Sequence, residues 1–157
     1  MRYLRFNQKG ETLIEALAAL AIISIVIVAV ATAVVTSLSN TKYNQNQTQS
    51  TKYAQQGIEQ VRQIRNNNYT NFKTYNGTYC LGKGQTTLGA SQGSCSVKNV
   101  DTFIRSVQIE QVPGCSANVA KISVSVSFTD GKCSGGTYCH QLTQTSCLST
   151  VNPVQGP

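Results

Sequence analysis

The sequence has few of the residues from which enzyme active sites are built. It contains one histidine and six acidic residues, and the acids beyond residue 38 are Glu59, Asp101, Glu110 and Asp130. It also lacks a G-x-S-x-G motif, a phosphate-binding glycine loop and metal-ligand spacing. The pattern therefore predicts a protein that is not an enzyme, with no catalytic residues, no bound cofactor and no metal site.

No Cys-x-x-Cys pair occurs, although the chain has six cysteines: Cys80, Cys95, Cys115, Cys133, Cys139 and Cys147. The adjacent Cys139 and His140 suggest a zinc ligand pair, but a single histidine and the spacing argue against structural zinc. An even number of cysteines in a small domain is typical of disulfides formed in an oxidising compartment. We therefore expect disulfides, and the sequence does not choose among the fifteen possible pairings.

Charged side chains are absent from residues 16–35, where Ser24 and Thr32 are the only polar residues. Such a stretch is long enough to span about 30 Å of bilayer hydrocarbon as a helix. It also lacks the polar stripe of a core helix in a soluble domain. We therefore predict a membrane-spanning helix over residues 11–38.

The flanking charges orient this segment. Arg2, Arg5 and Lys9 precede it, whereas only Lys42 follows closely. The positive-inside rule then places the N-terminus in the cytoplasm and the part beyond residue 38 outside. A cleaved secretory signal, with "AVATA" at residues 29–33 as its processing site, is the alternative, but an acid near the start of its apolar core is atypical of one.

Residues 39–68 are rich in Asn, Gln, Ser and Thr, yet their second half has a helical pattern. The apolar residues Ala54, Ile58, Val61 and Ile64 recur at helical spacing. We predict one helix from about residue 12 to about residue 66, which is weakest at residues 44–50. The asparagines at residues 66–68 are a plausible stop signal.

Residues 69–157 have the period of β-strands. Residues 120–131 alternate strictly, with serines on one face and apolar residues on the other, and end in a turn at residues 129–132. Residues 77–82, 102–112 and 139–148 are weaker strand candidates, and the last six residues are expected to be frayed. The predicted fold class is α+β, with a long N-terminal helix packed on a small antiparallel, disulfide-linked sheet.

The formal net charge is +7, of which residues 1–10 contribute three positive charges. The other basic residues are mostly single. A mildly basic, solvated surface is the simplest interpretation, because no clustered patch supports nucleic-acid binding.

Two acids stand at the start of the apolar run, and Glu15 in particular requires a partner. Glu11 and Glu15 both precede residues suited to lipid. An acid costs about 2.5–3.5 kcal/mol at mid-bilayer and less near the interface, where Glu15 would lie. Cleavage after Gly10 would create a free α-amine on Glu11. If helices pack side by side, Glu15 of one subunit can pair with the amine of the next, which would fix their axial offset.

The segment "KGETLIEALAAL" (residues 9–20) resembles the type III signal of type IV prepilins and pseudopilins. The resemblance implies cleavage by prepilin peptidase between Gly10 and Glu11, N-methylation of Glu11 and a filament-assembly role for Glu15. It also implies a pilin-like fold. The implied partners are other pilin subunits and an inner-membrane assembly platform. The chain would lie in the lipid bilayer before its export into an extracellular pilus.

The segment "QQGIEQVRQIRNNNY" (residues 55–69) is similar to the minor-pilin or pseudopilin subgroup. Two residues depart from the family pattern: Glu11 replaces the usual Phe, and Thr32 stands where many major pilins have Pro. The second departure favours a straighter helix and a minor subunit. A pseudopilin of a secretion or DNA-uptake system and a permanently membrane-anchored binding module remain alternatives to a pilus subunit.

Overall fold

The computed structural model describes residues 11–111, 115–116, 118–131, 133–134 and 138–150. The predicted leader (residues 1–10) and the C-terminal end expected to be frayed lie outside these residues. The chain divides into two compact units, residues 1–42 and 43–157, which are described separately. The elements are α1 (Glu11–Asn67), α2 (Tyr69–Phe72), β1 (Gly77–Cys80), β2 (Ile104–Glu110), β3 (Val119–Phe128) and β4 (His140–Ser149). The predicted α+β class is confirmed.

Helix α1 confirms the predicted long helix and continues through residues 44–50, where we expected it to be weakest. The hydroxyl groups there bond to carbonyls of the helix itself. Thr48 Oγ1 donates to the Asn44 carbonyl at 2.9 Å, and Ser50 Oγ donates to the Gln47 carbonyl at 2.9 Å. These side chains therefore coexist with the helix backbone instead of diverting it into turns.

Helix α1 ends within the run of asparagines at residues 66–68, as predicted. Helix α1 stops at Asn67, and the side chain of Asn68 then accepts a hydrogen bond from the Asn71 backbone N–H at 3.0 Å. This contact caps the short helix α2, whose Phe72 is fully buried. An Asn side chain is suited to this role because its oxygen satisfies a free N–H at a helix start.

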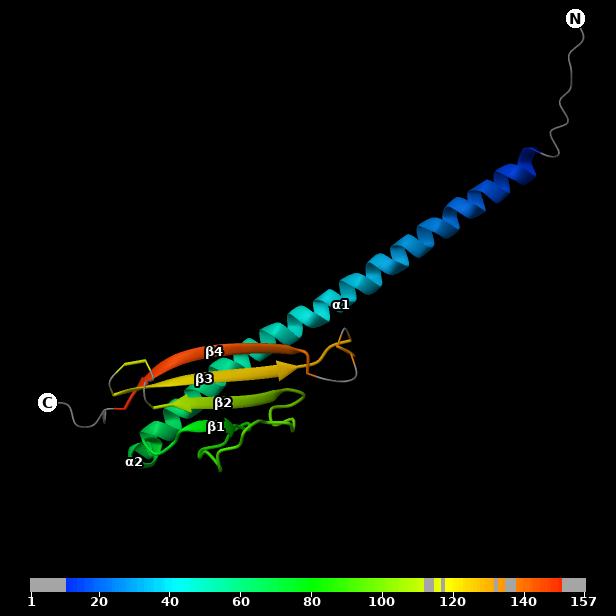
Figure 1. The fold of residues 1–157 in the computed structure, drawn as a ribbon. Coiled ribbons are helices and arrows are strands. Elements are labelled where there is room, and N and C mark those ends of the chain that lie inside the picture. The colour runs from blue at the N-terminus through cyan, green and yellow to red at the C-terminus, as the bar shows by residue number, and fades with distance from the viewer. Residues whose placement is uncertain (1–10, 112–114, 117, 132, 135–137, 151–157) are drawn as a thin grey trace, which may run out of the picture. The chain divides into compact units, whose positions relative to one another are not determined.

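The four strands form one antiparallel sheet in the order β1-β2-β3-β4, so each strand pairs with its neighbour in sequence (Figure 1). All four predicted strands are present. In the centre of the sheet Val107 of β2 lies opposite Tyr79 of β1 and Val124 of β3. The predicted turn at residues 129–132 falls just after β3: residues 129–131 belong to no strand, and residue 132 lies outside the described residues.

The second half of α1, from Tyr43 onward, covers one face of this sheet (Figure 1). Its buried positions are spaced alternately four and three residues apart, and they are Ser50, Ala54, Gly57, Val61 and Ile64. The helix approaches the sheet most closely at Gly57, where an added Cβ would lie 2.8 Å from Val124 Cγ1. Ile58, which we expected in the stripe, is only half-buried.

Strand β2 explains why its sequence pattern looked irregular. Arg105, Val107 and Ile109 all face α1 and are buried, so the inward face alternates strictly once the arginine is counted. Because an arginine is rarely fully buried, this alternation is hard to recognise in the sequence of residues 102–112. Arg105 is 1% exposed.

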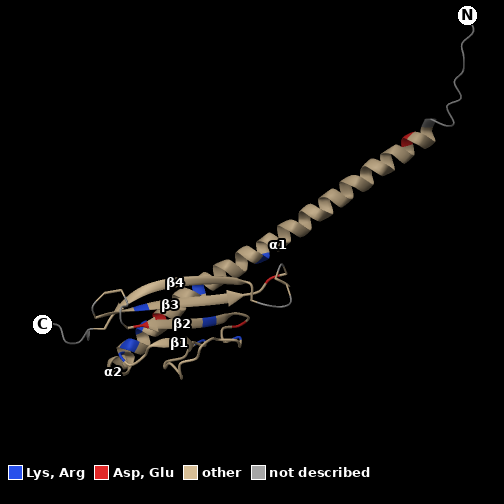
Figure 2. Cartoon of the chain, in the orientation of Figure 1, with Lys and Arg blue, Asp and Glu red and all other residues tan. Residues whose placement is uncertain are grey.

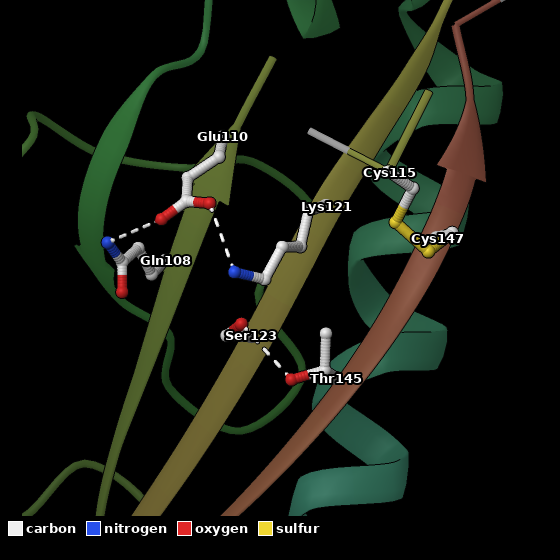
Figure 3. A network of polar contacts seen from close by, with 7 residues as sticks. All are labelled: Gln108, Glu110, Cys115, Lys121, Ser123, Thr145 and Cys147. Atoms are coloured by element: carbon white, nitrogen blue, oxygen red, sulfur yellow. Dashed lines mark hydrogen bonds and ion pairs between the residues drawn. A yellow bond between two sulfur atoms is a disulfide. The ribbon is translucent and has the colours of Figure 1, made fainter. Parts of the chain in front are cut away.

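The opposite face of the sheet is polar, and its side chains bond to one another (Figure 3). Ser123 and Thr145 are 3.2 Å apart, and Ser125 and Thr143 are 2.8 Å apart. Lys121 Nζ lies 3.2 Å from Glu110 Oε2. The sheet thus has one apolar face, which packs on the second half of α1, and one polar, outward face.

All six cysteines are paired, as expected from their number. The disulfides are Cys80–Cys95, Cys115–Cys147 and Cys133–Cys139. The first links β1 to the following loop, the second links the segment before β3 to β4, and the third closes the β3–β4 turn. Each bond joins segments of the sheet domain, where a small core gains most from covalent links.

Candidate functional site

The candidate site is the first half of α1, which lies in the first compact unit. Every side chain from residue 12 to residue 38 is exposed. These include large apolar side chains on all sides of the helix; Leu13 is 67% exposed, Ile25 70% and Val35 67%. Contiguous apolar surface of this extent marks a membrane or protein contact, and α1 is long and apolar enough to cross a membrane.

Glu15 is the only charged residue among the described side chains of residues 12–38 (Figure 2). The carboxylate is exposed on the first helical turns and surrounded in sequence by Leu13, Ile14 and Leu17. No ion pair joins Glu15 to a cation within the part of this chain that the structure describes. Its position suits a partner on another molecule.

The two hydroxyl residues in the charge-free stretch are satisfied within the helix. Ser24 Oγ donates to the Ala21 carbonyl at 2.8 Å, and Thr32 Oγ1 donates to the Ala29 carbonyl at 2.9 Å. Such bonds remove the need for water as a partner, which suits a helix in lipid or in a packed bundle. At residue 32, where many major pilins have Pro, the backbone remains helical.

The structure describes little of the predicted processing site. Gly10 lies outside the described residues. Glu11 is the first residue of α1, and its side chain is not described. Cleavage after Gly10 and methylation of Glu11 therefore remain predictions, as does the assembly role of Glu15.

The sequence analysis missed a buried cation that fixes the sheet domain to α1. The Arg105 guanidinium donates to the carbonyls of Leu81 (2.9 Å), Tyr53 (3.1 Å) and Gly82 (2.7 Å), and to Gln60 Oε1 (2.5 Å). Burial lowers the pKa of Arg105 to about 10, so it remains charged at neutral pH. The break in the β2 alternation was the available signal.

Beside the hydrogen bonds of Arg105, which we call the Arg105 clamp, α1 makes a second polar contact with the sheet domain. Tyr53 Oη donates to Asp101 Oδ2 at 2.5 Å. This hydrogen bond is the main reason that the pKa of Tyr53 is raised above its usual value of 10.0, with burial as a further cause. The contact ties the helix to the turn that precedes β2.

A third polar group lies at the β3–β4 turn. Asp130 Oδ1 and His140 Nε2 are 3.2 Å apart, next to the Cys133–Cys139 disulfide. Ligand-type atoms of these four residues all lie within 4.8 Å of one another, and they form the one such group among the described residues. The sequence analysis considered only the adjacent Cys139 and His140, because the fold is needed to add the other two.

Comparison with known proteins gives one family match. Residues 5–31 match the model of the prokaryotic N-terminal methylation motif, which includes the predicted cleavage site and Glu15. No curated protein and no solved structure matches the chain. The matched segment covers residues 11–31 of α1 and does not extend into the sheet domain.

Proposed function

We propose that this chain, whose N-terminal methylation motif supports the type IV pilin and pseudopilin family, is a structural subunit of a type IV pilus filament. The motif points to a structural protein and implies processing by prepilin peptidase and assembly with other pilin subunits. The apolar helix is consistent with membrane anchoring.

One observation carries the proposal: a single carboxylate stands at the start of an otherwise uncharged, exposed apolar helix. Neither lipid nor water suits the whole of this surface. A bundle of like helices suits it, because apolar side chains pack together and one acid per helix can meet one cation per neighbour. The α-amine created by cleavage after Gly10 would supply that cation.

The steps follow from this chemistry. The membrane would hold the uncleaved chain with its basic leader in the cytoplasm and the sheet domain outside. Removal of residues 1–10 would expose the amine of Glu11, which the peptidase would then methylate. An inner-membrane platform would transfer the helix from lipid into the growing filament, where pairing with Glu15 rewards a single axial offset.

The same motif serves pseudopilins of secretion or DNA-uptake systems, and it does not separate these from pilus subunits. Their proposed mechanism of helix packing is identical. Surface filaments that contain this chain, seen by immunogold electron microscopy, support the pilus role. Their absence in cells that make the mature chain supports the pseudopilin.

The proposed assembly role of Glu15 can be tested with a matched pair of variants on one helix. Glu15→Ala should leave the chain processed and membrane-bound but reduce its incorporation into sheared filaments at least tenfold, because the register contact is lost. Glu59→Ala is the control: Glu59 lies on the second half of α1, is 52% exposed, and among the described residues forms an ion pair with Arg62 of the same helix alone. Normal incorporation of Glu15→Ala would contradict the register mechanism.

A further inference from the structure

The β3–β4 turn brings together four side chains that can ligate a metal. Asp130 follows β3, Cys133 lies between β3 and β4, Cys139 immediately precedes β4, and His140 is the first residue of β4. Asp130 Oδ1 lies 3.2 Å from His140 Nε2 and 3.6 Å from Cys133 Sγ. The carboxylate therefore already contacts an imidazole and a sulfur.

The imidazole is held in place by its neighbours. The His140 ring stacks on Phe128 with centroids 5.1 Å apart and meets the edge of Tyr43 at 5.0 Å. The Asp130 side chain is 6% exposed and that of His140 is 27% exposed. The carboxylate and imidazole are thus oriented by packing, as in metal sites whose ligands are fixed before the ion binds.

The donor set is that of a zinc site once the disulfide is open. Two thiolates, one imidazole and one carboxylate are common Zn²⁺ ligands, and tetrahedral coordination places their ligand atoms about 3.3–3.8 Å apart. The two contacts of Asp130 already have such separations. All four ligand atoms lie within 4.8 Å of one another. The largest adjustment is between the two sulfurs, which are bonded in the disulfide and must separate by about 2 Å to act as two thiolate ligands.

We propose that the thiol form of the chain binds one Zn²⁺ through Asp130, Cys133, Cys139 and His140, and that zinc and the Cys133–Cys139 disulfide are alternative closures of the same turn. The newly made chain has thiols, so no reductant is needed. Binding forms two Zn–S bonds and releases the two thiol protons. Zinc would then hold the β3–β4 turn closed until the cysteines are oxidised.

Oxidation completes the exchange. The two thiolates give two electrons to an oxidising protein disulfide, which becomes a dithiol after taking up two protons. The Cys133–Cys139 bond forms and Zn²⁺ leaves, because a disulfide sulfur is a poor zinc ligand compared with a thiolate. An open depression of about 280 Å³, lined in part by Cys139 and His140, gives the ion access.

The other cysteines lack this surrounding. Cys115–Cys147 lies beside the polar outer face of the sheet (Figure 3), and Cys80 Sγ has the Gln92 side-chain oxygen at 3.2 Å. The chain has only one histidine. Zinc bound at this turn would therefore have an imidazole ligand, whereas zinc bound at the other thiols would have none, and this difference distinguishes the two.

The test uses the untagged full chain, purified in detergent without oxygen and with all thiols reduced. Zn²⁺ is added alone, and its stoichiometry is measured by elemental mass spectrometry. Alkylation followed by peptide mapping then shows which cysteines are protected. We expect one zinc per chain, protection of Cys133 and Cys139, and no protection of Cys80 and Cys95. Oxidation by a disulfide reagent should release the zinc as the Cys133–Cys139 bond forms.

Matched variants make the result specific. Cys133→Ser/Cys139→Ser should abolish stoichiometric binding, whereas Cys80→Ser/Cys95→Ser, which removes the same number of thiols, should retain it. His140→Phe, which keeps an aromatic ring against Phe128, should weaken binding by about tenfold or more. Equal protection of all cysteines, no binding, or unchanged affinity in His140→Phe would overturn the proposal. A reduced chain that cannot hold the turn would give no selective protection and would count against it too.

Discussion

The two halves of α1 differ in whether their apolar side chains are exposed or buried. From residue 12 to residue 38 the helix is apolar on all sides and exposed. From Tyr43 onward it is rich in Asn and Gln, yet Ala54, Val61 and Ile64 are almost completely buried. Among the described residues the apolar half therefore buries none of its side chains, whereas the polar half packs on its own sheet.

This difference shows that hydrophobic content alone does not identify the core of this protein. The buried face of the second half includes Ser50 and Gly57, because small residues let the helix approach the sheet. The exposed half has far larger side chains and buries none of them. What distinguishes the halves is periodicity: a one-sided stripe belongs to a domain core, and an all-round apolar surface belongs to lipid or a helix bundle.

The largest expected effect comes from a charge in the buried stripe. Val61→Asp should lower the free energy of unfolding of the sheet domain by about 4 kcal/mol, because the carboxylate would be buried without a partner. Such a loss is a large part of the stability of a small domain. Chemical denaturation of the full chain in detergent, followed by circular dichroism, measures it.

The same substitution in the other half sharpens the contrast. Val26, which is 54% exposed, should tolerate Asp without a change in the unfolding midpoint of the sheet domain. Membrane insertion of Val26→Asp should instead weaken by about 3 kcal/mol, because the charge would lie in hydrocarbon. If Val26→Asp unfolds the domain as severely as Val61→Asp, the two halves do not differ as described.

The buried arginine should come next in size. Arg105→Met keeps the apolar packing of the stem but removes four hydrogen bonds, although the Gly82 carbonyl keeps a second donor, Gln60 Nε2, at 3.3 Å. We expect a loss of about 3 kcal/mol in denaturant unfolding, since each unsatisfied buried group costs about 1–3 kcal/mol and the removal of a buried charge offsets part of this. Arg105→Lys should recover a minority of the loss. Unchanged stability in Arg105→Met would show that the clamp contributes nothing.

Close packing at Gly57 should have a smaller effect. Gly57→Ala places a Cβ 2.8 Å from Val124 Cγ1, and overpacking of this kind costs about 2 kcal/mol. Thermal unfolding should show the loss, and the double variant Gly57→Ala/Val124→Ala should recover part of it. Gln56→Ala, at the exposed neighbouring position, should be nearly neutral. A stabilised Gly57→Ala, as helix propensity alone predicts, would contradict the close approach.

The smallest effect is expected at Tyr53. The hydrogen bond to Asp101 raises the pKa of Tyr53, so its contribution is fully present below the unfolded pKa of about 10 and is lost as the pH rises through the folded value. Tyr53→Phe should cost about 1 kcal/mol at neutral pH. The difference from the parent chain should disappear in strongly alkaline solution. A difference that does not depend on pH would assign the loss to packing.

Much of the fold could be predicted from the sequence because its patterns are regular. The charge-free run, the stripe at Ala54, Val61 and Ile64, and the alternation in β3 each have one simple periodicity. The sequence pattern of strand β4 was less clear because its inward face includes the polar Gln144 and Ser146. Strand β2 was irregular because a buried charge occupies an apolar position.

The rest required three-dimensional contacts. The disulfide pairing depends on which loops the sheet brings together, and sequence spacing does not determine it. The Asp130–His140 pair forms only when the β3–β4 turn closes, so a search for a local metal motif did not find it. The acid at residue 15 could be recognised from sequence alone, because its surroundings are simple and a carboxylate there is costly.

The central claim is that the apolar half of α1 begins at a newly made amine on Glu11. Mass spectrometry of the native chain, isolated from membranes and from sheared surface filaments, measures that end directly. The account predicts a chain that starts at Glu11 in both fractions, with or without one methyl group. A chain that starts at Met1 in both would mean a permanent anchor, and one that starts near residue 32 or 34 would mean a secreted protein; either would contradict the account.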